Sequence, residues 1–222
     1  MATVNPRRFV HFAPARKDRN RLVPIRVSDM TSRDAAWWDA RVVPTIVAAS
    51  GRSDHLWVWS AMLPFLLLHQ LAKGRRCRPL VIWAYTDKCA LVRAAMSFII
   101  EGYPHLDVTQ PGLAHFLWFV SAAPDDIFAH YNVSDPPSLG AISVDSTMVL
   151  SEHRGLNGRM GLHAARAGRP RLQKLYGTIC QLIQLPEDVP LPGGIRRGND
   201  GWFFYADDER AGIVLSTRDA HR

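Results

Sequence analysis

The stretch from residue 139 to residue 176 limits what this chain can fold into more than any other part of the sequence. Residues 140–154 carry apolar side chains at helical spacing, and Gly155 follows where a helix commonly ends in a left-handed conformation. After an Asn-Gly turn, residues 159–165 are small and apolar, as in a short buried strand. Residues 171–182 then carry an apolar stripe at helical spacing. The pattern predicts helix, strand and helix in succession.

Two further segments predict strands that accompany this unit. Residues 79–86 combine β-branched and aromatic side chains, and residues 113–123 form an apolar run that suits a strand buried on both faces. The other expected elements are helices at about 34–49, 56–73 and 87–102, a helical turn at 125–131, a strand at 202–206 and a short helix after Asp207. Alternating strands and helices indicate an α/β fold.

The layout resembles the C-terminal half of the GNAT acyltransferase superfamily over roughly residues 79 to 206. The resemblance is carried by the segment Gly161-Leu-His-Ala164, the Leu175-Tyr-Gly177 of the following helix and the Leu185-Pro186 after it. It implies a GNAT-like mixed central sheet with helices on both faces. In that superfamily one strand, here residues 115–123, splays from its neighbour. Acyl-coenzyme A lies in the gap, with its pyrophosphate on a loop at a helix N-terminus.

Two side chains are candidate catalytic groups. Tyr176 matches, by the resemblance, a helix tyrosine that many members use as general acid toward the leaving thiolate. His163 belongs to the strand beside the expected cleft, where an imidazole can take a proton from an acceptor amine or hydroxyl. Each also has an ordinary structural interpretation: a tyrosine that packs on an amphipathic helix, and a histidine hydrogen-bonded between core elements. Both interpretations stay open at this point.

The resemblance also assigns roles to backbone groups. It implies that N–H groups of the strand orient the thioester carbonyl and that those of the loop and helix start hold the pyrophosphate. The strand residues are Val120, Ser121 and Ala122, and those of the loop and helix start are Ser138, Leu139 and Gly140.

The loop at residues 134–140 departs from the superfamily pattern of Arg or Gln, two residues, Gly, one residue, then Gly or Ala. It contains one glycine, two prolines that lack an N–H, and Asp135 close to the expected phosphate position. This departure favours a second hypothesis, a degenerate member of the fold that has lost the cofactor and serves as a binding or effector protein.

The charge of the chain is unevenly distributed. Residues 1–26 contain seven basic residues and one acidic residue, whereas the other 196 residues carry 20 basic and 19 acidic side chains. We therefore expect a basic N-terminal arm at residues 1–26, followed by a single GNAT-like domain at 27–222. Such an arm either contacts an anionic partner, such as nucleic acid or a membrane surface, or is a solvated leader.

Several kinds of site are not expected. The three cysteines and nine histidines show no ligand spacing, so no metal site is predicted, and the cysteine usage suits a reducing compartment. The longest apolar run, residues 56–68, is shorter than the roughly 20 residues that cross a bilayer. No secretory signal is seen, which favours a cytoplasmic protein. Asp145, on the helix 140–154, is expected at the surface.

The sequence thus predicts transfer of an acyl group, acetyl being the expected one, from acyl-coenzyme A to an amine or hydroxyl of a small-molecule or protein acceptor. The degenerate binding protein is the alternative. A nucleic-acid-binding protein led by the basic arm ranks last, because no recognised module or basic face with interleaved aromatic residues accompanies it.

Overall fold

The computed structural model describes residues 8–48, 52–165, 170–192 and 201–222. Eight strands form one mixed sheet in the order β1-β2-β3-β4-β5-β6-β8-β7. The strands are β1 (Phe12–Pro14), β2 (Leu22–Asp29), β3 (Arg76–Tyr85), β4 (Leu91–Pro104), β5 (Leu113–Ala122), β6 (Met160–Ala165), β7 (Ile183–Gln184) and β8 (Gly201–Ala206). Neighbouring strands are antiparallel, except that β5 and β6 are parallel.

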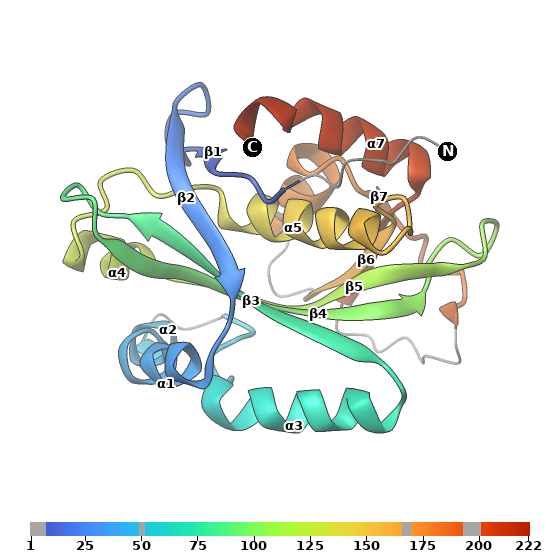
Figure 1. The fold of residues 1–222 in the computed structure, drawn as a ribbon, viewed down its shortest axis with the longest axis horizontal. Helices are drawn as coiled ribbons and strands as arrows, with labels where there is room; N and C mark the ends of the chain where they lie inside the picture. Colours follow the sequence, from blue (N-terminus) through green and yellow to red (C-terminus); the bar gives the residue numbers. More distant parts are fainter. Residues whose placement is uncertain (1–7, 49–51, 166–169, 193–200) are drawn as a thin grey trace.

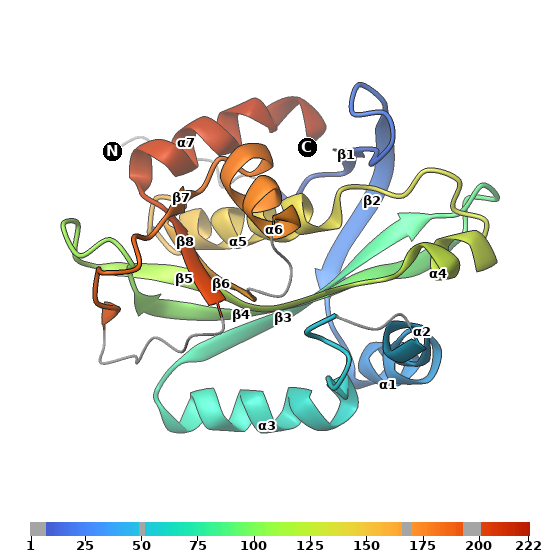
Figure 2. The same cartoon turned by 180° about the vertical axis from the view of Figure 1, so that it is seen from behind.

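Helices cover both faces of this sheet, which confirms the predicted α/β class. One face carries α5 (Leu139–His153), α6 (Arg171–Gln173), the π-helical segment η2 (Lys174–Ile179) and α7 (Asp208–Thr217) (Figures 1 and 2). The other face carries α1 (Ser32–Arg41), α2 (Val43–Ala48) and α3 (Trp59–Ala72). The short helices α4 (Asp125–His130) and η4 (Asp219–His221) complete the order.

The segments that define the unit at residues 139–176 form as predicted. The expected helix 140–154 is α5, the strand 159–165 is β6, and the helix 171–182 is α6 continued by η2 as far as Ile179. The strands expected at 79–86, 113–123 and 202–206 are β3, β5 and β8. The expected helix 34–49 is divided into α1 and α2, and its last residue lies outside the described residues.

The helix expected at 87–102 is wrong, because this segment forms strand β4. A tight turn joins β3 to β4, with Cys89 in the left-handed region at φ 60°. β4 lies between β3 and β5, and its residues from Ala94 to Ile100 are buried in succession. A strand buried on both faces lacks polar alternation, so its alanines and apolar residues were indistinguishable from a buried helix.

The basic arm is not separate from the domain. The boundary expected between residues 26 and 27 falls inside β2, and Val10, Ala13 and Ile25 are buried in the main core. Two of the arginines form internal ion pairs, Arg16 with Asp125 and Arg21 with Asp135. From residue 8 onward the basic segment is thus built into the sheet, and residues 1–7 lie outside the described residues. An anionic partner stays a prediction.

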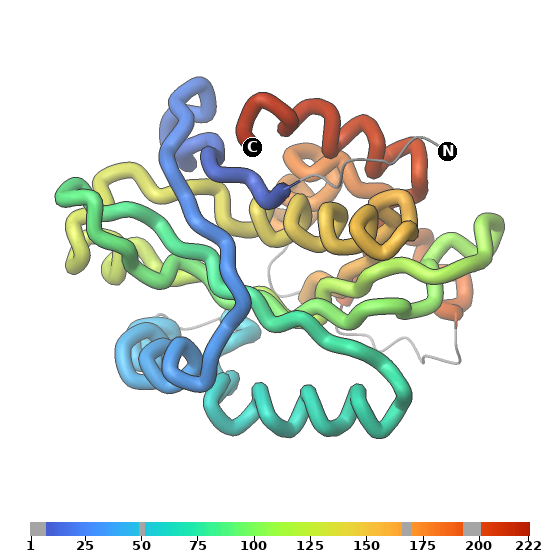
Figure 3. Tube along the Cα trace, in the orientation of Figure 1, coloured from blue at the N-terminus to red at the C-terminus, as the bar shows by residue number. Residues whose placement is uncertain are grey.

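Helix α5 is buried over nearly its whole length, and this places a carboxylate in the core. Asp145 is fully buried, which corrects the expected surface position. Its Oδ1 accepts a hydrogen bond from Arg222 Nη2 at 2.8 Å, and Arg218 Nη1 lies 3.8 Å away. The end of the chain that supplies these cations is held beside the N-terminal segment by a hydrogen bond from His11 N–H to the His221 carbonyl (Figure 3).

His115, near the start of β5, is a buried histidine in an apolar setting. It is fully buried, and neither ring nitrogen has a hydrogen-bond partner among the described residues. Burial lowers the pKa of its imidazole from 6.5 to about 4; Glu101 opposes this shift and Arg154 adds to it. The ring is therefore neutral in the folded protein at neutral pH.

Deleting residues 1–26 should destabilise the fold, because β1 and most of β2 are removed together with their buried side chains. We expect the melting temperature to fall by more than about 5 °C, corresponding to a loss of more than roughly 1–2 kcal/mol in a domain of this size. Thermal melts followed by circular dichroism test this. A truncated chain with an unchanged melting temperature would show that the arm is dispensable.

His115 should make the protein acid-sensitive. Its pKa is lower in the folded state than in the unfolded chain, so the stabilisation is complete above pH 6.5 and is lost as pH falls toward about 4. We expect the unfolding free energy of His115→Leu to change less with pH over this range than that of the wild type. Urea titrations between pH 7.5 and 4.5 measure both. The control is His130→Gln at an exposed position. Equal pH dependence in wild type and His115→Leu would contradict the assignment.

Candidate functional site

The candidate site begins where β5 and β6 part. The two strands pair over three positions only, from His115 opposite Met160 to Leu117 opposite Leu162. β5 continues to Ala122 without β6, while β6 continues to Ala165 paired with β8 (Figure 2). An interrupted parallel ladder leaves backbone groups of β5 unpaired along that edge.

A bulge in β5 marks the same place. Phe98 of β4 is opposite Phe119, but the next residue, Ile99, is opposite Leu117, so Trp118 is an extra residue in the strand. Bulges redirect side chains and locally increase the twist of a strand. Trp118 and Phe119 consequently both face the side of α1 to α3, where Phe119 packs against Trp57 at 4.7 Å between ring centroids and Trp118 against Tyr103.

Beyond the bulge, the backbone groups of the three predicted strand residues of β5 do not all point the same way. Ala123 N–H donates to the Ala94 carbonyl of β4 at 2.8 Å, and backbone groups alternate along an antiparallel ladder. Ser121 therefore faces β4, whereas Val120 and Ala122 direct their backbone groups to the edge that β6 leaves. The Ala122 carbonyl there accepts a hydrogen bond from Arg52 at 2.8 Å. The N–H groups of Val120 and Ala122 both point to this open edge.

The N-terminus of α5 is partly covered by the chain itself. Ser138 N–H donates to the Pro14 carbonyl at 3.1 Å, and Arg16 N–H donates to the Pro136 carbonyl at 2.9 Å. An isolated bridge between Ala15 and Pro137 lies between these bonds. The segment after β1 thus pairs with the loop at 134–140 in the manner of a short strand. Of the three predicted loop residues, Leu139 and Gly140 keep N–H groups that have no acceptor within the helix.

Gly140 is also required by packing. A Cβ at this position would lie 2.7 Å from Cδ2 of Leu175, which comes from η2. The close approach brings η2 against the start of α5, so the segment that carries Tyr176 lies beside the loop.

Tyr176 is packed on the α5 side of the sheet. Its side chain is 7% exposed and contacts Phe204 of β8 at 5.7 Å between ring centroids. Burial raises the pKa of the Tyr176 hydroxyl, and the nearby Cys180 thiol adds to the shift. The hydroxyl is therefore protonated at neutral pH and is a weaker acid than an exposed tyrosine.

His163 lies on the opposite face of the sheet from Tyr176. Its ring contacts Phe203 at 5.0 Å, and Phe203 belongs to the core on the side of α1 to α3, whereas Phe204 belongs to the core around α5. Successive residues of a strand point to opposite faces. The structure therefore places the two candidate catalytic side chains on opposite faces of the sheet, near the parting strands.

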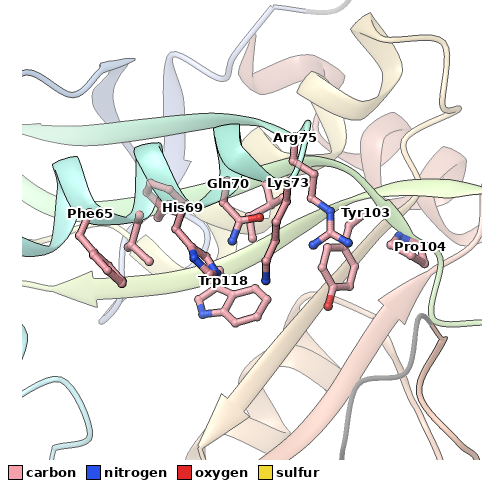
Figure 4. A pocket seen from close by; sticks show the side chains of 11 residues that line it. Phe65, His69, Gln70, Lys73, Arg75, Tyr103, Pro104 and Trp118 are labelled. Atoms are coloured by element: carbon pink, nitrogen blue, oxygen red, sulfur yellow. The ribbon is translucent and has the colours of Figure 1, made fainter.

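A pocket of about 420 Å³ lies under the sheet, between α3 and strands β4 and β5 (Figure 4). The bulged Trp118 forms part of its wall, so the pocket adjoins the point where β5 leaves β6. It is lined by Phe65, Leu66, His69, Gln70, Lys73, Arg75, Phe98, Ile100, Tyr103, Pro104 and Trp118.

Sequence reasoning missed two parts of this region. One is the ion pair of Arg52 with the buried Asp54, whose Oδ2 also accepts from the Ser121 hydroxyl at 2.6 Å and so fixes the loop before α3 to β5. The other is the pocket itself, which combines residues of α3, β4 and β5 that lie far apart in the sequence. Among the described residues, no group of His, Cys, Asp and Glu could hold a metal ion, and no helix is long and apolar enough to cross a bilayer.

Comparison with known proteins identifies the fold. No protein-family model matches the chain, and no curated protein matches its sequence significantly. Apo FdhC, a nucleotide-linked sugar GNAT, aligns with 97% of this chain and 99% of its own length at a TM-score of 0.55 and 7% sequence identity. The alignment spans nearly both chains, and it shows that the two proteins share the GNAT fold. The resemblance inferred from the sequence is therefore confirmed at the level of the fold.

Two further solved structures score slightly lower. A GNAT-family acetyltransferase from Staphylococcus aureus Mu50 aligns with 83% of this chain and 99% of its own length, at a TM-score of 0.49 and 11% identity. A spermidine N-acetyltransferase from Vibrio cholerae, solved with CoA and spermine, aligns with 84% and 97% at a TM-score of 0.48 and 13% identity.

Proposed function

We propose that this chain, which has the GNAT fold, transfers an acyl group, acetyl in the simplest case, from acyl-coenzyme A to an amine or hydroxyl acceptor. The observation that carries the proposal is the parting of β5 and β6 after three residue pairs, with the β5 bulge at the same position. An unpaired strand edge costs free energy unless something uses its backbone groups. An acyl-pantetheine chain is a ligand of the right shape, since it is extended and carries amide groups.

In this proposal, the proton donor and the proton acceptor act from opposite faces of the sheet. The Val120 N–H is directed to the open edge, where it would donate to the thioester carbonyl oxygen. Tyr176, on the α5 side, would give its proton to the departing sulfur as the C–S bond breaks. His163, on the other side, would remove the proton from the acceptor as the new bond to the acyl carbon forms. The acceptor would approach from the face of α1 to α3.

The start of α5 offers some, but not all, of the hydrogen-bond donors that the phosphates of acyl-coenzyme A would need. Leu139 and Gly140 N–H groups at the start of α5 suit one phosphate. However, Ser138 N–H is used by Pro14, two prolines supply no N–H, and Arg16 and Arg21 are paired with carboxylates. The loop therefore offers fewer donors than a glycine-rich one, and we expect weak binding of the nucleotide part.

The second candidate function is binding without catalysis. The observation that favours it is the pairing of the segment after β1 with the phosphate loop, which covers part of the cofactor site with the chain itself. On this hypothesis the fold presents surfaces to a partner and no longer takes up acyl-coenzyme A.

Calorimetric titration with acetyl-coenzyme A separates the two functions. We expect a measurable heat and a dissociation constant in the range of about 10⁻⁵ to 10⁻³ M, weaker than a complete phosphate loop would give. Free coenzyme A in the same titration measures the contribution of the acyl group. No heat at millimolar ligand would support the binding protein and reject the transferase.

Tyr176→Phe should impair acyl transfer more than it impairs cofactor binding. Loss of the hydroxyl removes the proton donor for the sulfur, an effect of about 10² to 10⁴ in rate for general acid catalysis, while ground-state contacts are kept. We expect kcat to fall with KM for acyl-coenzyme A nearly unchanged. The matched control is Tyr85→Phe, at the end of β3. Wild-type turnover in Tyr176→Phe would make Tyr176 a packing residue.

A further inference from the structure

The pocket under the sheet lies on the face from which the proposed acceptor would approach. It is on the face of α1 to α3, opposite α5 and η2, and it is bounded by the bulged Trp118 at the parting of β5 and β6. Residues of α3 and β4, with Lys73 and Arg75 from the turn between α3 and β3, form the rest of its wall. The chemical character of this wall therefore indicates which acceptor the chain can hold.

The charge of the pocket is positive. Lys73 and Arg75 both line it, and none of its lining residues is acidic. Among the described residues neither cation has a carboxylate partner within salt-bridge distance. The Arg75 guanidinium lies 4.8 Å from the centre of the Tyr103 ring, and Lys73 extends toward Trp118 (Figure 4). Two unpaired cations beside aromatic faces favour an anionic group on the ligand.

The floor of the pocket carries an unsatisfied hydrogen-bond acceptor. Gln70 is only 4% exposed, and its buried Oε1 has no partner among the described residues. Buried amide oxygens are nearly always hydrogen-bonded, and leaving one unpaired costs free energy. This oxygen is shielded from solvent, so a ligand N–H or O–H group pairs with it once the Gln70 amide turns toward the pocket.

The remaining wall is largely aromatic and apolar. Phe65, Tyr103 and Trp118 contribute rings, and Leu66, Phe98 and Ile100 contribute apolar surface. A volume of about 420 Å³ is within the range of small-molecule sites and too small for a folded protein segment. An aromatic or bulky apolar body of amino-acid size matches it.

We propose that this pocket binds an aromatic amino acid or a close analogue as the acyl acceptor. The carboxylate lies against Lys73 and Arg75, the amine donates to Gln70 Oε1, and the ring packs on Trp118 and Tyr103. The term acceptor rests on the proposed transferase function, whereas binding in the pocket does not. In the transfer itself the amine nitrogen bonds to the acyl carbon, the C–S bond breaks, and the proton lost by nitrogen balances the one gained by sulfur.

The test is a calorimetric titration, without acyl-coenzyme A, of three compounds that differ in one group each. L-Phenylalanine has both the anion and the amine, L-phenylalaninamide lacks the anion, and 3-phenylpropionate lacks the amine. We expect L-phenylalanine to bind at millimolar concentration or below and each of the others to bind about tenfold more weakly.

Variants locate the binding. Lys73→Gln and Arg75→Gln should each weaken the binding of L-phenylalanine about tenfold. Gln70→Leu should weaken the binding of L-phenylalanine but leave the binding of 3-phenylpropionate unchanged. Arg76→Gln is the matched control, because Arg76 is exposed, carries the same charge and does not line the pocket. The inference is overturned if L-phenylalanine does not bind, if its amide binds equally well, or if Arg76→Gln has the effect of the pocket variants.

Failure of the inference and failure of the proposed function give different results. If L-phenylalanine binds through Lys73 and Arg75 but acetyl-coenzyme A gives no heat, the pocket is a ligand site and the transferase function is rejected. If acetyl-coenzyme A binds and L-phenylalanine does not, the transferase function stands and the acceptor belongs to another class.

Discussion

The burial of α5 is the constraint on which the rest of the structure depends. Twelve of its fifteen residues are buried, and they include Asp145, three serines and Thr147. A buried carboxylate needs a partner, and removing one side of such a pair typically costs about 3–5 kcal/mol. The partner of Asp145 is Arg222, at the C-terminal end, whose Nη1 also donates to the Arg8 carbonyl of the N-terminal segment at 2.6 Å. Both ends of the chain are thereby packed around one helix.

This packing also engages the loop at residues 134–140. The N-terminal segment that helps to enclose α5 runs directly over the start of the helix, where Pro14 accepts from Ser138. The same contacts that satisfy the core therefore occupy the Ser138 N–H at the start of α5. If acyl-coenzyme A binds as we propose, its phosphates find fewer free N–H groups there.

The two faces of the sheet differ in how completely they are closed. The α5 face is sealed by α6, η2, α7 and the chain ends (Figures 1 and 2). On the other face α3 exposes Phe65, Leu68 and Leu71 and leaves a pocket against β4 and β5. In the proposed reaction, the acyl donor would lie on the closed side of the parting strands and the acyl acceptor on the open side.

The sequence by itself determined the segments whose pattern is local. Helical spacing in residues 140–154, the Asn-Gly turn and the small-residue strand predicted α5 and β6 closely. Only the tertiary structure decided the rest. β4 is a strand because β3 and β5 pair with it on both edges, and its continuous burial erases the alternation that identifies strands. Likewise, Asp145 is internal because residues distant in sequence cover it, and charge or spacing along a single segment carries no record of that contact.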